Sequence, residues 1–367
     1  MTDPLVTLGV PVYRGQDRLP ALLECLRTQS YRDIEVLISV DGGDQPSADA
    51  CEPFLRQDSR FRMHVQPTRL GWAGNTDWTM RNRRGDFYVY QQHDDLLSPT
   101  YIAELVAAAA RWPNAVICFS KVQFTGLSNA VASAPSLLGD HAADRALLFL
   151  RRLDWVPFRG LMRGSALDRT SGLLLSDFDP FDSYGTELRI MTELALQGEF
   201  RFVEGPTYFK SNHGENVSFK RAGWSREHRI KATACFAAWM IEVLAPAGET
   251  VDERRRLFRI ALERFAGRQG SLKWIAIFSG WLRRNPSKAL TPLRIIRDKL
   301  KQSERVMEAL GGLYPIREIS AEDRPLLLKQ IFERLKGGNR FEPGECLNAT
   351  WEALEAEVLR QYRIASF

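Results

Sequence analysis

The stretch Ile34-Glu35-Val36-Leu37-Ile38-Ser39-Val40-Asp41-Gly42-Gly43 decides the fold. Its β-branched, mostly apolar residues predict a buried strand, and the aspartate followed by two glycines marks the loop where that strand ends. Residues 6–12 and 87–92 repeat the pattern, and the latter run is followed by His93-Asp94-Asp95. The first hundred residues therefore hold several strands that each end in a polar cluster.

Helical patterns separate these strands. Leucines recur at helical spacing within residues 19–29, and residues 75–83 and 101–111 also predict helices. Two more strands are expected, at residues 61–66 and 115–122. Short connections between alternating strands and helices predict an α/β fold with a mostly parallel sheet. Ligands bind such sheets beyond the carboxyl ends of the strands, where the polar clusters should meet.

The pattern changes near residue 218. From there helical periodicity dominates, most clearly in residues 226–244, 251–265, 272–282 and 325–335. We therefore predict a catalytic domain over residues 1–217 and an α-helical C-terminal domain over residues 218–367.

Composition narrows the class of protein. Of the 367 residues, 44% are hydrophobic and 26% are charged, which is typical of globular chains. No run of about 18 apolar residues predicts a transmembrane helix, and the N-terminus does not resemble a secretory signal. The five cysteines are widely spaced, which disfavours a disulfide framework or a zinc site. We expect a cytoplasmic protein.

Three further segments carry a family resemblance. They are Val10-Pro11-Val12-Tyr13-Arg14-Gly15, Arg69-Leu70-Gly71-Trp72-Ala73-Gly74-Asn75 and Gly85-Asp86-Phe87-Tyr88-Val89-Tyr90-Gln91-Gln92-His93-Asp94-Asp95. With residues 34–43, their order and spacing over residues 5–125 resemble the inverting glycosyltransferases of family 2, which have the GT-A fold. The resemblance implies a sheet of the Rossmann-like nucleotide-diphospho-sugar transferase type.

This resemblance implies a nucleotide-diphosphate sugar as donor, with a UDP-sugar expected, and Mn²⁺ or Mg²⁺ as cofactor. The metal ligands that it implies are Asp95 and His213. His93 stands where the family has the first aspartate of its metal motif, so the triplet departs from the pattern. The implied donor-binding residues are Pro11, Tyr13, Asp41, Arg69, Gly71, Asn75 and Asp94, the last facing the ribose.

A second block lies near residues 184–213. Counting back from Gly198, Glu187 stands where the family has its catalytic aspartate, and Thr186 replaces the acid before it. An inverting displacement needs a base to take the proton of the acceptor hydroxyl, and Glu187 is the candidate. Asp182 is the reserve candidate. The alternative for Glu187 is an acid that only stabilises a helix N-terminus.

Two arginines lie where the acceptor-side strand is expected. Arg159 and Arg163 are candidates for binding an acidic acceptor or the pyrophosphate. Pairing on the protein surface is the alternative for both.

Residues 268–301 form a basic segment. It holds nine Lys and Arg residues against one acid, Asp298, interleaved with Trp and Phe. Such a segment suits an anionic membrane surface, which predicts a peripheral association with the inner face of the membrane. The alternative is an ordinary helix packed on the catalytic domain. No nucleic-acid recognition motif accompanies the charge, so a nucleic-acid partner is not expected.

The predicted function is transfer of a sugar to an acceptor hydroxyl, on a glycan or a lipid-linked acceptor, in the synthesis of an envelope polysaccharide or glycoconjugate. A nucleotidyltransferase would share the sheet, but Val12-Tyr13-Arg14-Gly15-Gln16 is not its glycine-rich basic loop. The replacements at His93 and Thr186 leave a second alternative, a catalytically impaired nucleotide-sugar-binding or scaffold protein.

Overall fold

The computed structural model describes residues 3–213, 221, 223–266, 319–320, 322–338 and 340–362. Its centre is a nine-stranded sheet with the order β3-β2-β1-β4-β8-β6-β9-β5, and β7 pairs with β6. The first four strands of this order run parallel to each other. They are β1 (Val6–Val12), β2 (Ile34–Val40), β3 (Phe61–Val65) and β4 (Phe87–Tyr90), and β1, β2 and β4 are buried throughout.

The other half of the sheet is mixed. β8 (Leu161–Arg163) is antiparallel to both of its neighbours, β4 and β6 (Ala115–Gly126). β9 (Glu199–Asn212) runs parallel to β6, and its pairing reaches the carboxyl end of both strands. The short strands β5 (Leu96–Leu97) and β7 (Val131–Ala132) pair antiparallel with β9 and β6.

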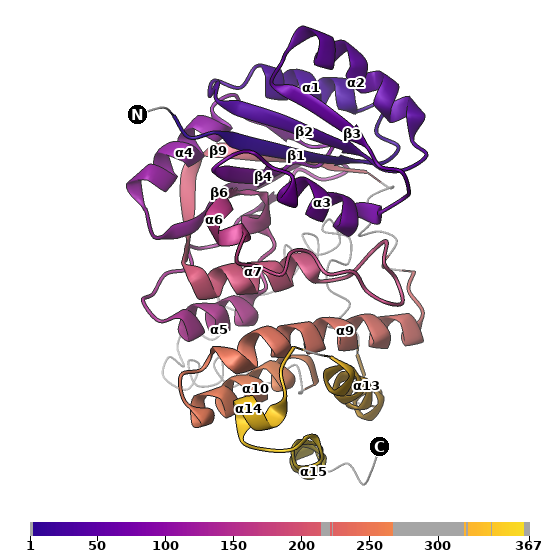
Figure 1. Ribbon diagram of the computed structural model, residues 1–367, viewed down its shortest axis with the longest axis vertical. Coiled ribbons are helices and arrows are strands. Elements are labelled where there is room, and N and C mark those ends of the chain that lie inside the picture. The colour runs from indigo at the N-terminus through magenta and orange to yellow at the C-terminus, as the bar shows by residue number, and fades with distance from the viewer. Residues whose placement is uncertain are drawn as a thin grey trace, which may run out of the picture.

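Helices cover both faces of the parallel half (Figure 1). α1 (Leu19–Arg27) and α2 (Gln45–Gln57) lie on one side of the strands, and α3 (Gly71–Arg81) lies on the other. α4 (Tyr101–Arg111) packs on β6 and β9. The leucines of α1 recur at three- and four-residue spacing and are fully buried, which explains why this segment is helical and how it attaches to the sheet.

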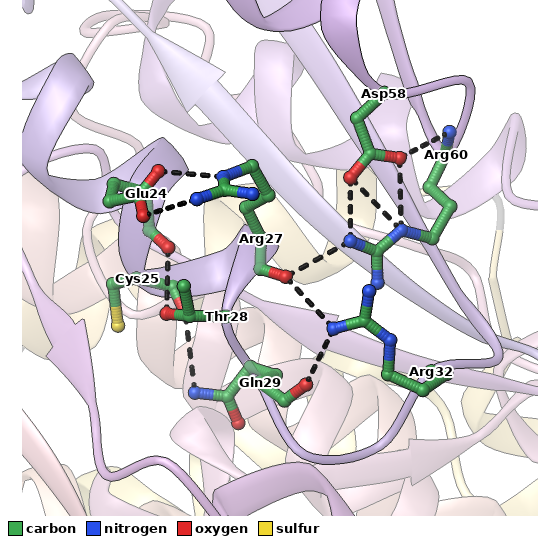
Figure 2. Close-up of polar contacts among 8 residues, drawn as sticks. All are labelled: Glu24, Cys25, Arg27, Thr28, Gln29, Arg32, Asp58 and Arg60. Carbon is green, nitrogen blue, oxygen red and sulfur yellow. Dashed lines mark hydrogen bonds and ion pairs between the residues drawn. The ribbon is translucent and has the colours of Figure 1, made fainter.

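The C-terminus of α1 is anchored at the edge where β2 and β3 begin (Figure 2). The Arg27 carbonyl oxygen accepts hydrogen bonds from Arg32 at 3.2 Å and from Arg60 at 3.0 Å. Arg60 is held in turn by the carboxylate of Asp58. These bonds satisfy a helix carbonyl that has no partner within the helix, and they lie at the amino edge of the sheet.

A helical layer lies beyond the sheet (Figure 1). α7 (Thr186–Gln197) packs on α5 (Ala142–Arg152) and on α9 (Arg226–Leu244), and α9 packs on α10 (Val251–Ala266) and α13 (Arg324–Gly337). Segments Val156–Arg159 (η1), Gly164–Leu167 (α6), Ala245–Ala247 (η2), Pro343–Leu347 (α14) and Trp351–Tyr362 (α15) complete the described elements. The helix Arg226–Ala247 contains an 18-residue stretch that is long and apolar enough to span a membrane. However, 67% of that stretch is buried in the protein, as in the core helix of a globular fold.

The predicted α/β class with a mostly parallel sheet and a helical C-terminal part is confirmed. The strands at residues 6–12 and 34–40 and the helices at 101–111 and 226–244 have the predicted bounds. Helix α3 begins four residues earlier than predicted, at Gly71, and β6 extends to Gly126 because it pairs with the whole carboxyl half of β9.

Two predictions lie outside the described residues. They are the basic segment 268–301, including the helix expected at 272–282, and the domain boundary at residues 217–218. Buried side chains of α7 and α9 belong to one continuous core with the sheet. The division into two domains stays a prediction.

Candidate functional site

The turn that leads into α3 is held by Asp41, the residue that follows β2. The Asp41 carboxylate is 1% exposed and accepts hydrogen bonds from the backbone amides of Leu70 at 2.6 Å and Gly71 at 3.0 Å. Two backbone N–H groups at the start of α3, which have no acceptor within the helix, thereby gain a hydrogen-bond partner. Asp41 organises the turn at the carboxyl edge, and its predicted contact with the donor stays a prediction.

Gly71 is required by this turn for two reasons. Its φ angle is +73°, a conformation that other residues rarely adopt. A Cβ atom at this position would also lie 2.8 Å from the Cα atom of Phe181. The turn is thus packed directly against the loop that precedes α7.

Asn75 connects the turn to the sheet. Its side-chain amide donates to the Ser39 carbonyl oxygen at 2.9 Å and to the Val12 carbonyl oxygen at 3.4 Å, and its oxygen accepts from the Ser39 hydroxyl at 2.5 Å. Pro11 pairs in register with Ser39, at the part of β1 that extends beyond β4. Asn75 and Pro11 therefore shape the carboxyl edge between β1 and β2.

An open stack of side chains lies beside this edge. The Arg69 guanidinium lies 4.2 Å from the centre of the Tyr13 ring and 4.7 Å from that of Phe181. Phe181 is 46% exposed. Planar groups that are ordered by cation–π contacts and remain accessible suit the stacking of a nucleobase or a sugar.

Asp94 and His213 meet although they are far apart in the sequence. A ring nitrogen of His213 lies 2.8 Å from one carboxylate oxygen of Asp94. Burial alone would raise the pKa of Asp94, but the hydrogen bond to His213 and the charge of Lys210 hold it well below its ordinary value. The other oxygen, Oδ1, is buried and has no hydrogen-bond partner among the described residues. Asp94 is therefore an ionised carboxylate with one oxygen available to a ligand.

Asp95 is fully buried and is held on both oxygens. It accepts hydrogen bonds from the Tyr208 hydroxyl at 2.9 Å and from the backbone amide of Ser211 at 2.8 Å. The ammonium group of Lys210 lies 3.6 Å away. The structure therefore pairs His213 with Asp94 and places Asp95 behind them, against β9.

Arg159 connects this carboxylate cluster to the other side of the site. Its guanidinium lies over the Tyr90 ring at 4.7 Å and donates to the side-chain oxygen of Gln92 at 2.8 Å. Burial would lower the pKa of Arg159, but tyrosine groups and the carboxylates of Asp95 and Glu187 raise it overall. The charges of Asp95, which follows β4, and of Glu187, in the first turn of α7, therefore both act on Arg159.

Glu187 is the second residue of α7, which follows Gly185. The φ angle of +82° at Gly185 lets the chain turn closely over the Phe236 ring. Its Oε2 atom is buried without a hydrogen-bond partner among the described residues. Burial raises the pKa of Glu187, and the charge of Arg221 offsets part of that rise. A buried carboxylate with a raised pKa and an available oxygen has the properties of a general base.

Asp182, the reserve candidate for the base, is already paired. The Nε atom of Arg221 lies 3.0 and 3.2 Å from the two Asp182 carboxylate oxygens. The Arg221 guanidinium also lies 4.9 Å from the Tyr184 ring centre. The geometry favours Glu187 as the base and Asp182 as part of its surroundings.

Arg163 is not brought to the site. It pairs with Phe87, the first residue of β4, at the end opposite to Asp94 and Asp95. Its guanidinium donates to the backbone carbonyl oxygens of Ala115 at 3.2 Å and Ala109 at 3.4 Å. Of the two predicted acceptor arginines, only Arg159 contacts the segment that carries Asp94 and Asp95, through Gln92.

The described residues contain no cluster of three or more His, Cys, Asp or Glu side chains that could hold a metal ion. They offer two potential metal ligands, the available oxygen of Asp94 and the His213 side chain beside it. A cation such as Mg²⁺ commonly binds one or two carboxylates and completes its coordination with water and substrate phosphates. The residues fit a metal that is shared with a diphosphate.

Sequence reasoning missed Lys210, Tyr208 and Arg221. Tyr208 and Lys210 are two residues apart on β9, so they share a face of the sheet, and both contact Asp95. That period-two spacing was a usable signal. Arg221 follows a segment without strong periodicity, and no sequence signal marked it.

Part of this chain is similar to known glycosyltransferases. Residues 7–166 match the model for glycosyl transferase family 2. The putative glycosyltransferase EpsH of Bacillus subtilis is 31% identical over 34% of this chain and 36% of its own length. Glycosyltransferase GlyA of Streptococcus pneumoniae is 26% identical over 29% of this chain and 15% of its own length. The matched region is thus well under two thirds of either relative.

Solved structures support the fold over more of the chain. Residues 1–349 of S. aureus TarS superpose with a TM-score of 0.56 at 13% identity, covering 90% of this chain and 89% of that one. The same protein in complex with UDP-GlcNAc gives a TM-score of 0.53 at 13% identity, with the same coverage. At this identity the likeness concerns the fold alone.

Proposed function

Because residues 7–166 match the model for glycosyl transferase family 2 and the sheet is of the GT-A type, we propose that the protein is an inverting glycosyltransferase. It moves a sugar from a nucleotide-diphosphate donor to an acceptor hydroxyl. The observation that carries this proposal is the cluster after β4, where Asp94 contacts His213 at 2.8 Å and Asp95 accepts a hydrogen bond from Tyr208 at 2.9 Å. Residues from two distant parts of the chain thereby meet at the carboxyl edge of the sheet, and Glu187 raises the pKa of Arg159 beside this cluster.

In the proposed step Glu187 accepts the proton of the acceptor hydroxyl. The acceptor oxygen forms a bond to the anomeric carbon while the bond from that carbon to the diphosphate breaks. The nucleoside diphosphate leaves as an anion, and the configuration at the anomeric carbon inverts. The raised pKa and available Oε2 atom of Glu187 support the role of base.

We assign the metal ligands within this proposal to Asp94 and His213. Their contact at 2.8 Å and the available Asp94 oxygen support this choice over Asp95, whose two oxygens accept hydrogen bonds from Tyr208 and Ser211. A bound Mn²⁺ or Mg²⁺ supplies positive charge to the diphosphate. Asp95 then holds Lys210 and the backbone of β9 in position behind the two metal ligands.

The donor proposed is a UDP-sugar. The GT-A fold and the crystal structures of S. aureus TarS with UDP and with UDP-GlcNAc support this choice. The stack of Tyr13, Arg69 and Phe181 would accept the base or ribose beside the turn that Asp41 holds. The acceptor is a glycan or lipid-linked hydroxyl, on the cytoplasmic side of a membrane to which residues 268–301 are proposed to bind.

The test is a transfer and hydrolysis assay with a panel of UDP-, GDP- and dTDP-sugars, with and without Mn²⁺ or Mg²⁺. We expect wild-type protein to release nucleoside diphosphate from one donor, and Asp94→Asn and Glu187→Gln to lose this activity. Asp49→Asn and Glu52→Gln on α2 are matched controls, because they change the same groups where Asp49 pairs with Gln45 and Glu52 with Arg56 within the helix. Nucleotide binding without any turnover of the panel would favour the binding or scaffold alternative.

A further inference from the structure

Two cations meet at one neutral oxygen beside the carboxylate cluster. The ammonium group of Lys210 lies 2.6 Å from the side-chain oxygen of Gln92, and the Arg159 guanidinium lies 2.8 Å from the same oxygen. Lys210 comes from β9 and Arg159 from η1, so the fold brings them together from different elements. The two positive charges are therefore close neighbours.

Such an arrangement is unfavourable unless an anion compensates it. The Lys210 side chain is only 15% exposed, so water screens its charge poorly. Of the nearby carboxylates, Asp94 is paired with His213, and Asp95 lies 3.6 Å from Lys210. The Nε atom of Arg159 is buried and has no hydrogen-bond partner among the described residues. Asp95 therefore balances part of this charge, and the unpaired Nε of Arg159 and the remaining N–H donors of Lys210 are left for a ligand.

The position of the pair limits what that ligand is. Gln92 and Asp94 lie on the same segment after β4, at the carboxyl edge where the donor would lie. A guanidinium and an ammonium group side by side match the charge and the several acceptor oxygens of a diphosphate. We propose that Lys210 and Arg159 bind the diphosphate of the donor and stabilise its charge as it leaves.

This inference rests on the proposed function and adds to it. It assigns Arg159 to the leaving group instead of the acceptor. It also accounts for a metal site with few protein ligands, because two fixed cations share the neutralisation of the diphosphate.

The experiment measures binding of UDP, UMP and uridine by calorimetry, first in EDTA and then with Mn²⁺. GDP, dTDP and their monophosphates replace them if wild-type protein prefers another base. In EDTA we expect Lys210→Met to weaken UDP binding about 10- to 100-fold, as the loss of a charged hydrogen bond predicts, and to change uridine binding less than about twofold. Arg159→Met should act in the same direction, and Lys210→Arg should restore most of the affinity.

Lys231→Met is the matched control, because Lys231 lies on α9 and pairs with Glu227. It should leave UDP binding unchanged. Unchanged preference for UDP over UMP in both Lys210→Met and Arg159→Met would overturn the inference while leaving the proposed function standing. If wild-type protein binds none of the diphosphates, the proposed function fails and this inference fails with it.

Discussion

The turn into α3 and the start of α7 both border the candidate site, but they differ in how far their buried polar groups are hydrogen-bonded. In the turn, Asp41 and Asn75 are buried and each forms several hydrogen bonds to β1, β2 or the turn itself. At the start of α7, polar atoms of Tyr184, Thr186 and Glu187 are buried without hydrogen-bond partners among the described residues. Buried polar groups are rarely left in this state.

The difference indicates that one of these regions has a structural role and the other a functional role. A fully bonded network makes the turn rigid, so its role is to hold a binding surface in shape. Unpaired groups cost stability, and they are retained where a substrate provides the partner. The turn should therefore respond to mutation mainly in stability, and the start of α7 mainly in activity.

Glu187→Gln gives the sharpest test of this division. We expect the transfer rate to fall about 10²- to 10⁴-fold, the usual range for loss of a general base, with donor affinity nearly unchanged. Steady-state kinetics and UDP binding measure the two effects. A mutant that retains the wild-type rate would show that Glu187 is not the base.

The same substitution should not destabilise the fold at neutral pH. Burial raises the folded-state pKa of Glu187 above its ordinary value of 4.5, so the folded state favours the protonated form. Its contribution to stability is present at low pH and is lost as pH rises through the folded pKa. Glu187→Gln keeps the neutral form at every pH, so its melting temperature should equal or exceed that of wild type above that pKa. A large loss would mean that the carboxylate is structural.

Asp41→Ala should produce the opposite result. It leaves the amides of Leu70 and Gly71 unpaired in a buried turn, so we expect a loss of about 2–4 kcal/mol in the free energy of unfolding. Asp41→Asn, which keeps one acceptor oxygen, should lose less. Denaturant unfolding measures both. Equal stability of wild type and Asp41→Ala would contradict the structural role of the turn.

These two regions were not equally predictable from the sequence. β1 and β2 have buried residues throughout and follow their apolar runs residue by residue, and Asp41 directly follows β2. Gly71 and Asn75 belong to the first turn or two of α3, after β3. α2 was not predicted, since Pro46 and Pro53 and a weakly apolar composition hide its periodicity. A strand was expected near Arg159 and Arg163, and β8 covers only Leu161–Arg163, which is too short for its sequence to show its bounds or its antiparallel direction.

The contacts that assemble the site were harder still. His213 meets Asp94 and not Asp95 because the pairing of β9 with β5 and β6 sets its position, and sequence spacing carries no information on that register. Arg159 and Arg163 are four residues apart, yet they lie toward different ends of β4. The pairing of strands that are distant in the sequence sets the positions of His213 and of both arginines.

A smaller effect is expected from the pair Asp182 and Arg221, which border Glu187. The charge of Arg221 lowers the pKa of Glu187 and that of Asp182 raises it. A base acts when deprotonated, so the rate should rise with pH through a pKa above 4.5. Arg221→Gln should move this rise to higher pH, and Asp182→Asn to lower pH. Complete loss of activity in folded Asp182→Asn would instead identify Asp182 as the base.

Arg163→Gln should have the smallest effect on activity. Arg163 donates to the carbonyl oxygens of Ala115 and Ala109 and lies over the Phe87 ring, at the end of β4 away from Asp94. Loss of these bonds should lower the free energy of unfolding by about 1 kcal/mol, while kcat/KM changes less than about twofold. Arg159→Gln, measured beside it, should lose activity because its guanidinium donates to Gln92, on the segment that carries Asp94, and is proposed to bind the diphosphate. If Arg163→Gln lost as much activity as Arg159→Gln, the site would have to extend to both ends of β4, and the separation of a structural from a catalytic region would fail.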